Sequence, residues 1–177
     1  MTLTDIVAEA PRPLLRRLVR ETLDNVEFVL ALPDDANELA GLFDKFFAEA
    51  HYRDRGIVYS HDKAEAWLER AITSGSCPHI IGRHQQDGIV GVVSYGLDSS
   101  FCEKPIAILH TVFVLPAWRR TAVGRILVAL ATEAAIGDGA VAFHAPIASG
   151  MNETATLINL FKRAGFTAIG TIMGRAL

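Results

Sequence analysis

Three arginines gather around one turn of the sequence, within the stretch HTVFVLPAWRRTAVGRILVAL at residues 110–130. The stretch starts as an apolar strand, breaks at a proline, passes through a short turn that contains Gly124, and continues as an amphipathic helix. The first N–H groups of a helix lack internal partners and lie at the positive end of its dipole. Arg119, Arg120 and Arg125 add charge-assisted donors. The stretch therefore predicts a site for a phosphate or a pyrophosphate.

Two common phosphate motifs do not explain this turn. The sequence contains neither GxxxxGK[ST], the loop of nucleoside-triphosphate enzymes, nor GxGxxG, the dinucleotide fingerprint. An ordinary helix start with solvated arginines stays open as the alternative. Basic residues are electrostatically unfavourable at a helix N-terminus, and this favours a bound anion.

The composition describes one soluble domain. The chain has 177 residues, half of them hydrophobic, and a formal net charge of −3. This charge gives no general reason to bind nucleic acid or an anionic membrane. No apolar run approaches the roughly 18 residues of a membrane span, and the N-terminus does not resemble a secretory signal. Cys77 and Cys102 form no CxxC pair and no zinc-ligand cluster, so we expect free thiols, no metal site and a cytoplasmic protein.

Hydrophobic periodicity and turn residues predict the elements that must position the arginine turn. We expect strands at residues 26–33, 78–84, 88–98, 104–116 and 140–146, a closing strand pair within 165–177, and helices at 34–50, 60–75, 123–136 and 152–164. Strands joined by short turns pair antiparallel, and strands separated by a helix pair parallel. The sequence therefore predicts a mixed α/β sheet with helices on both faces. Residues 1–24 are expected to be an N-terminal extension with a helix at 13–23.

Two motifs in this order resemble a known family. VLPAWRRTAVGRIL, residues 114–127, resembles the acetyl-CoA motif V-x-P-x-x-R-x-x-G-x-G of the GNAT N-acetyltransferases, with matches at Val114, Pro116, Arg119 and Gly124. LINLFKRAGF, residues 157–166, resembles the ALYEKLGF segment of that family. The resemblance implies an acyl-CoA N-acyltransferase fold over residues 25–177. Such a fold has a mostly antiparallel sheet of six to seven strands, splayed at the middle, with about four helices.

The resemblance also implies acetyl-CoA as a cosubstrate and assigns residues to it. Backbone N–H groups would hold the pyrophosphate, assisted by Arg119 or Arg120, and they belong to Thr121, Ala122, Val123, Gly124 and Arg125. Ala122 stands where the family has its first loop glycine. The pantetheine arm would pair like a strand with the backbone of Val112, Phe113 and Val114, and the amide of Asn152 would reach it. The ring of Phe161 would lie near the thioester sulfur.

The groups that move protons are less clearly marked in the sequence. Some family members have a glutamate base four residues before the motif valine, and this position is His110. An imidazole titrates near neutrality, so His110 suits a base; a histidine satisfied within the sheet is the alternative. The family's frequent tyrosine acid is replaced by Phe161, which has no proton to give. Water, Tyr59, Tyr95 or Cys102 would then protonate the leaving thiolate.

The resemblance implies transfer of an acetyl or acyl group to a primary amine. The acceptor could be a small molecule, a protein amine or an aminoacyl group on tRNA, and no other nucleic acid is expected. The habits of the family also suggest a homodimer. Two alternatives stay open. The first is a coenzyme A-binding module that has lost its chemistry, and the phenylalanine at position 161 supports it. The second is an interaction protein that uses the N-terminal helix.

Overall fold

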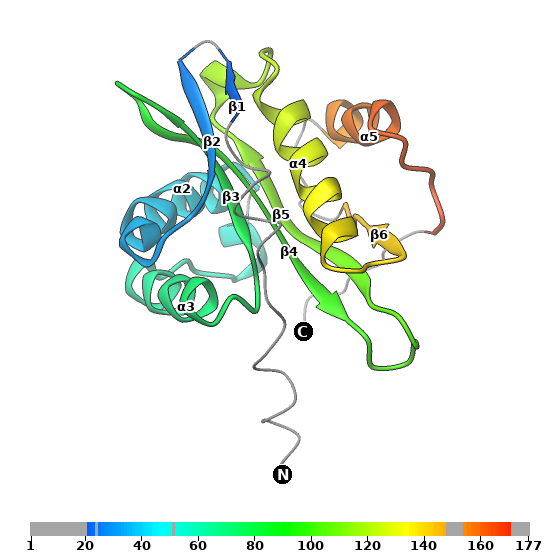
Figure 1. Cartoon of the computed structure of the whole chain (residues 1–177). Coiled ribbons are helices and arrows are strands. Elements are labelled where there is room, and N and C mark those ends of the chain that lie inside the picture. The colour runs from blue at the N-terminus through cyan, green and yellow to red at the C-terminus, as the bar shows by residue number, and fades with distance from the viewer. Residues whose placement is uncertain (1–20, 24, 51, 148–153, 171–177) are drawn as a thin grey trace.

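Six strands and four α-helices make up the fold of the computed structural model, which describes residues 21–23, 25–50, 52–147 and 154–170 (Figure 1). The strands are β1 (Glu21–Leu23), β2 (Val26–Leu30), β3 (His79–His84), β4 (Gly88–Asp98), β5 (Ile106–Val114) and β6 (Ala142–His144). The α-helices are α2 (Ala36–Glu49), α3 (His61–Ser74), α4 (Val123–Gly137) and α5 (Thr154–Arg163), and short 3-10 turns are η2 (Pro33–Asp35), η3 (Tyr52–Arg55) and η4 (Pro116–Trp118).

The strands form one sheet in their order along the chain. Neighbours from β1 to β5 pair antiparallel, and only β5 and β6, which helix α4 connects, pair parallel. Figure 1 shows α2 and α3 on one side of the sheet and α4, with α5 beside it, on the other. The predicted mixed, mostly antiparallel sheet with helices on both faces is therefore confirmed.

Two apolar cores lie on the two faces, because side chains alternate along a strand. Val93 of β4 belongs to the core under α4, together with Leu127. The neighbouring Val92 belongs to the core under α2 and α3, together with Phe43 and Leu68. Within the ranges that the structure describes, no helix is long and apolar enough to cross a membrane.

The predicted elements differ from the structure near both ends of the chain. Glu21–Leu23 was expected to end a helix, but it is strand β1 and pairs with β2. The sheet thus extends into the segment that we expected to be an N-terminal extension, and residues 1–20 lie outside the described residues. No strand forms over residues 166–170, where the closing pair was expected to begin. Phe166 packs against Phe161 and Phe143 instead, and the rest of that pair lies outside the described residues.

Strand β5 separates from β6 soon after they pair. The paired residues are Ile106 with Ala142, Ala107 with Phe143 and Ile108 with His144, whereas β5 continues to Val114. Leu115 N–H donates to Val90 of β4, so alternate peptide groups near the end of β5 point toward β4, and those between them point toward the open side. Among the described residues, the second half of β5 is thus a sheet edge that leads directly to α4.

A β-bulge in β5 decides where His110 lies. Tyr95 faces Leu109 and the preceding Ser94 faces Thr111, so His110 is the extra residue. Leu109 packs into the core under α4, whereas Phe113, four residues on, packs into the core under α2 and α3. Regular alternation would put both on one face, so the bulge switches the phase. It leaves His110 over Gly96, where an added Cβ would lie 2.9 Å from the imidazole Cε1.

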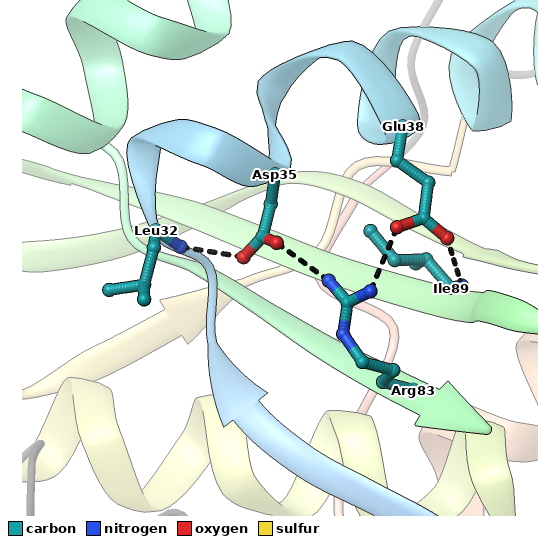
Figure 2. A network of polar contacts seen from close by, with 5 residues as sticks. All are labelled: Leu32, Asp35, Glu38, Arg83 and Ile89. Carbon is teal, nitrogen blue, oxygen red and sulfur yellow. Dashed lines mark hydrogen bonds and ion pairs between the residues drawn. The ribbon is translucent and has the colours of Figure 1, made fainter. Parts of the chain in front are cut away.

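An ion-pair network fixes the start of α2 against the sheet (Figure 2). The Arg83 guanidinium of β3 donates to Asp35 at 2.6 Å and to Glu38 at 2.9 Å. Glu38 also accepts the N–H of the buried Ile89, and Asp35 accepts the N–H of Leu32 at 2.8 Å. The two carboxylates therefore hold the first turns of α2 against β3 and β4.

Candidate functional site

A cavity of about 560 Å³ opens where the free edge of β5 meets the N-terminus of α4 and one side of α5. It falls within the usual size range of ligand pockets. Most of the residues predicted to bind the cofactor line it, namely Val112, Phe113, Val114, Arg119, Arg120, Thr121, Ala122, Gly124 and Arg125. The strand, the turn and the helix start thus form one continuous wall.

The turn before α4 leaves three N–H groups for a ligand. Thr121 N–H bonds Trp118 O, and Val123 N–H bonds the hydroxyl of Thr121, both at 3.2 Å. These two groups are occupied because η4 and the threonine cap the helix start, so two of the five N–H groups expected to serve already have partners within the protein. Within the described residues no hydrogen bond uses the N–H of Ala122, Gly124 or Arg125. The positive end of α4 therefore presents free donors at the cavity.

The arginines of the site have two different tasks. Arg119 donates from Nε to Val114 O at 3.0 Å, forms an ion pair with Glu49 of α2, and lies over the Phe113 ring at 5.4 Å. Its guanidinium is thus already bound to protein groups. Arg120 and Arg125 are exposed at the cavity, and in the part of the chain that the structure describes they form no ion pair. They are the side chains of the turn best placed for an anion.

Helix α5 supplies a wall that the sequence analysis did not predict. Its side chains at the cavity include Thr156, Asn159, Leu160 and Arg163. They recur every three or four residues, so they share one face of the helix. This spacing could have revealed the face, and Arg163 adds a third exposed guanidinium to those of Arg120 and Arg125.

Two residues predicted to bind the cofactor, Phe161 and Val123, do not line the cavity. Phe161 is 4% exposed and packs edge-on against Phe166 at 5.1 Å, so its ring belongs to the core under α4 instead of lying in the cavity. The side chain of Val123 is buried in the same core. Asn152 lies outside the described residues.

His110, the predicted base, is not among the residues that line the cavity and lies with a cluster of neutral polar groups. Its Nδ1 is 3.4 Å from the Cys77 sulfur. The residue is exposed, yet partial burial of the imidazole lowers the pKa of His110 below its ordinary value. The nearby His79 is 2% exposed, donates from Nδ1 to Cys77 O at 2.7 Å, and has a pKa that burial lowers to about 4. Both imidazoles are therefore neutral at pH 7.

The alternative proton donors are two tyrosines whose hydroxyls already donate to protein groups, and one cysteine at the surface. Tyr59 donates its hydroxyl to Ala40 O at 2.6 Å, and burial, with Asp44, raises its pKa to about 12. Tyr95 is fully buried and donates to Asp138 at 2.8 Å. Cys102 is a free, exposed thiol in the loop between β4 and β5. Among the described residues, no group of three His, Cys, Asp or Glu side chains could hold a metal ion.

The comparison with protein families identifies this arrangement. The profile described as "Acetyltransferase (GNAT) family" matches residues 29–166, which include the β5–turn–α4 unit and α5. The chain belongs to the GNAT acetyltransferase family. No curated protein sequence matches it.

Solved structures of acetyltransferases share the fold. A putative acetyltransferase from an Arthrobacter species has a TM-score of 0.68 and 16% identity, covering 89% of this chain and 99% of its own. AAC(6')-Iy in complex with a bisubstrate analogue, CoA-S-monomethyl-acetylneamine, has a TM-score of 0.66 and 16% identity, covering 85% and 96%. An aminoglycoside acetyltransferase from an uncultured soil metagenomic sample, in complex with sisomicin, has a TM-score of 0.66 and 13% identity, covering 86% and 95%. At these identities the likeness concerns the fold.

Proposed function

We propose that the protein transfers an acetyl group from acetyl-CoA to a primary amine. The observation that supports this most directly is the cavity where the open edge of β5 meets the free N–H groups of α4. One wall offers the unpaired edge of a strand, and the other offers a helix N-terminus with exposed arginines. A ligand with a peptide-like arm and a pyrophosphate suits both walls. A solved relative that was crystallised with CoA agrees with this choice.

Different residues of the cavity would bind different parts of the cosubstrate. The N–H groups of Ala122, Gly124 and Arg125 would hold the pyrophosphate, with Arg120 and Arg125 as charged partners. The edge of β5 at Val112 and Val114 would pair with the amides of the pantetheine arm. The bound thioester supplies an activated acetyl group. Arg119 would act indirectly, since it holds the end of β5 against Glu49.

His110 would accept the proton of the amine. It sits in the bulge of β5, just before the strand edge that faces the cavity. Its lowered pKa leaves the imidazole neutral at physiological pH, as a base must be. No carboxylate occupies this place on the strand, so the acid limb of kcat/KM would report an imidazole.

A coenzyme A-binding module without chemistry is the second candidate. It is favoured by the burial of Phe161 and by the engagement of the Tyr59 and Tyr95 hydroxyls, the two tyrosines expected as alternative donors to the thiolate. A thiol of reference pKa about 8.5 is a fair leaving group, and water can protonate it. We therefore favour a slow enzyme over an inactive module.

The acceptor is proposed to be a small-molecule amine. Two of the solved proteins that share the fold are aminoglycoside acetyltransferases, which agrees with this class without naming the acceptor. A protein amine and an aminoacyl group on tRNA are the other acceptors to include in a screen.

Release of free thiol from acetyl-CoA in the presence of an amine panel tests the proposal. The natural protein should turn over at least one amine, and His110→Gln should lose about 10²-fold or more of kcat. His61→Gln, which changes a half-buried histidine at the start of α3, is the matched control and should keep the natural rate. Coenzyme A binding with no turnover of any amine would favour the binding module.

A further inference from the structure

The imidazole of His110 is held by two neighbours that do no chemistry of their own. Cys77 Sγ lies 3.4 Å from Nδ1, and the ring covers the bare backbone of Gly96. A Cβ on Gly96 would lie 2.9 Å from Cε1 and 3.0 Å from Nε2, so the ring could not keep this place beside a larger residue. The ring is therefore positioned from two sides, and among the described residues its one hydrogen-bond contact is made by Nδ1.

The state of the other ring nitrogen follows from that contact. A neutral imidazole has one N–H and one lone pair, and the hydrogen bond of one nitrogen decides the state of the other. If Nδ1–H donates to sulfur, Nε2 has the lone pair. If the thiol donates to Nδ1, Nε2 has the hydrogen and cannot take a proton from an amine.

The surroundings of Cys77 favour sulfur as the acceptor. Cys77 is 4% exposed, and burial raises the pKa of its thiol to about 11, so it stays a neutral thiol. A hydrogen bond from the buried Ser94 lowers the thiol pKa, as a hydroxyl that donates to sulfur does, so the sulfur already acts as an acceptor on that side. The backbone of Cys77 is also fixed, since its carbonyl accepts Nδ1–H of His79. A buried, protonated thiol is a poor nucleophile, which leaves it a positioning task.

We propose that Cys77 is a positioning residue whose sulfur accepts Nδ1–H of His110 and keeps the ring's lone pair on Nε2, where it can take the proton of the amine. The inference rests on the proposed role of His110 as the base. Once Nε2 has gained that proton, Nδ1–H keeps its partner, so the same contact also supports the imidazolium. Cys77 therefore sets the tautomer of the base without touching the substrate.

The ¹⁵N spectrum of the histidine rings tests the tautomer without any turnover. In the full-length protein at neutral pH, His110, assigned by its loss in His110→Gln, should show a protonated Nδ1 and an unprotonated Nε2. Cys77→Ala should move the ring toward the Nε2–H form or a mixture of both tautomers. A natural protein with the Nε2–H tautomer would overturn the inference.

Kinetics of matched cysteine variants give a second test. Cys77→Ala should lower kcat about tenfold, as outer partners of functional histidines do, with KM for acetyl-CoA unchanged. Cys77→Ser keeps an acceptor and should recover most of the loss, and His61→Gln, which lies outside the proposed machinery, should match the natural protein. If His110→Gln is inactive but folded Cys77→Ala is fully active, only the inference fails. If His110→Gln is active, the proposed base fails as well, and acetyl found on Cys77 by mass spectrometry would replace the positioning role with a nucleophilic one.

Discussion

Arg119 matches the arginine of the acetyl-CoA motif, yet its side chain contacts other parts of the protein. The sequence predicted correctly that arginines surround the start of a helix, because the strand, proline, turn and periodic helix are all local signals. It could not predict that Glu49, which is 70 residues away, takes one of these arginines. In the proposed site, the side chains left for an anion would be Arg120 and Arg125, and Arg163 from α5 lines the same cavity.

This division of tasks predicts opposite effects for two arginines. Arg119→Ala removes the donor to Val114 O and the partner of Glu49, so the free energy of unfolding should fall by about 1–3 kcal/mol. Arg125→Ala removes an exposed side chain at the cavity, so stability should stay the same while coenzyme A affinity falls about tenfold. Denaturant unfolding and calorimetry separate the two. Equal losses of affinity with unchanged stability would show that Arg119 binds the ligand directly.

The buried imidazole of His79 predicts a pH-dependent stability. Its pKa is lowered to about 4 in the folded protein, against about 6.5 in the unfolded chain, so the unfolded chain binds more protons between these values. Stability from this group is complete above pH 6.5 and is lost as the pH falls toward 4, by about 3 kcal/mol.

The variant His79→Asn isolates this effect. Its side-chain amide does not titrate and can replace the Nδ1–H donor to Cys77 O. Between pH 7 and pH 4, the free energy of unfolding of the variant should fall by about 3 kcal/mol less than that of the natural protein. Parallel pH curves for the two proteins would mean that His79 is not held neutral by the fold.

At the scale of elements, the sheet and its first helix are joined by a few long-range polar contacts. Arg83 of β3 binds both Asp35 and Glu38 near the start of α2 (Figure 2). Glu38 is also the acceptor for Ile89, a residue that is only 4% exposed. A buried N–H without a partner is costly, so this contact matters more than the exposed ion pair beside it.

Glu38 therefore offers a graded test of how α2 is attached. Glu38→Ala should lower the free energy of unfolding by about 1–3 kcal/mol, because Ile89 N–H loses its acceptor. Glu38→Gln keeps an amide oxygen for Ile89 and loses only the charge facing Arg83, so it should cost less than half as much. Urea unfolding of the three proteins gives the comparison, and equal losses for the two variants would assign the effect to the ion pair.

For the whole molecule, the sequence predicted the helices and strands better than it predicted their irregularities and their long-range contacts. Strand β4 has the predicted bounds, and Gly75 ends α3 with φ of 64°, because hydrophobic alternation and a glycine in a left-handed cap are local signals. The separation of β5 from β6 agrees with the splayed sheet that the family resemblance implied. The bulge at His110 is a long-range feature. So are the burial of Phe161 and the joining of Cys77 to His110. None of them has a periodic signal, so the structure was needed to bring these residues together.

The central claim is that the cavity between β5, α4 and α5 holds coenzyme A with its pyrophosphate at the start of α4. A calorimetric titration of coenzyme A into the natural protein, Gly124→Ala and Gly124→Asp tests it most directly. A Cβ at Gly124 would meet Leu160 and Val114 at 3.6 Å, an ordinary contact, so both variants should fold. The account predicts one molecule bound per chain and an affinity that falls at least about tenfold in Gly124→Asp, where the carboxylate repels the pyrophosphate. No heat at concentrations up to about 1 mM, or equal affinity in a folded Gly124→Asp protein, would contradict it.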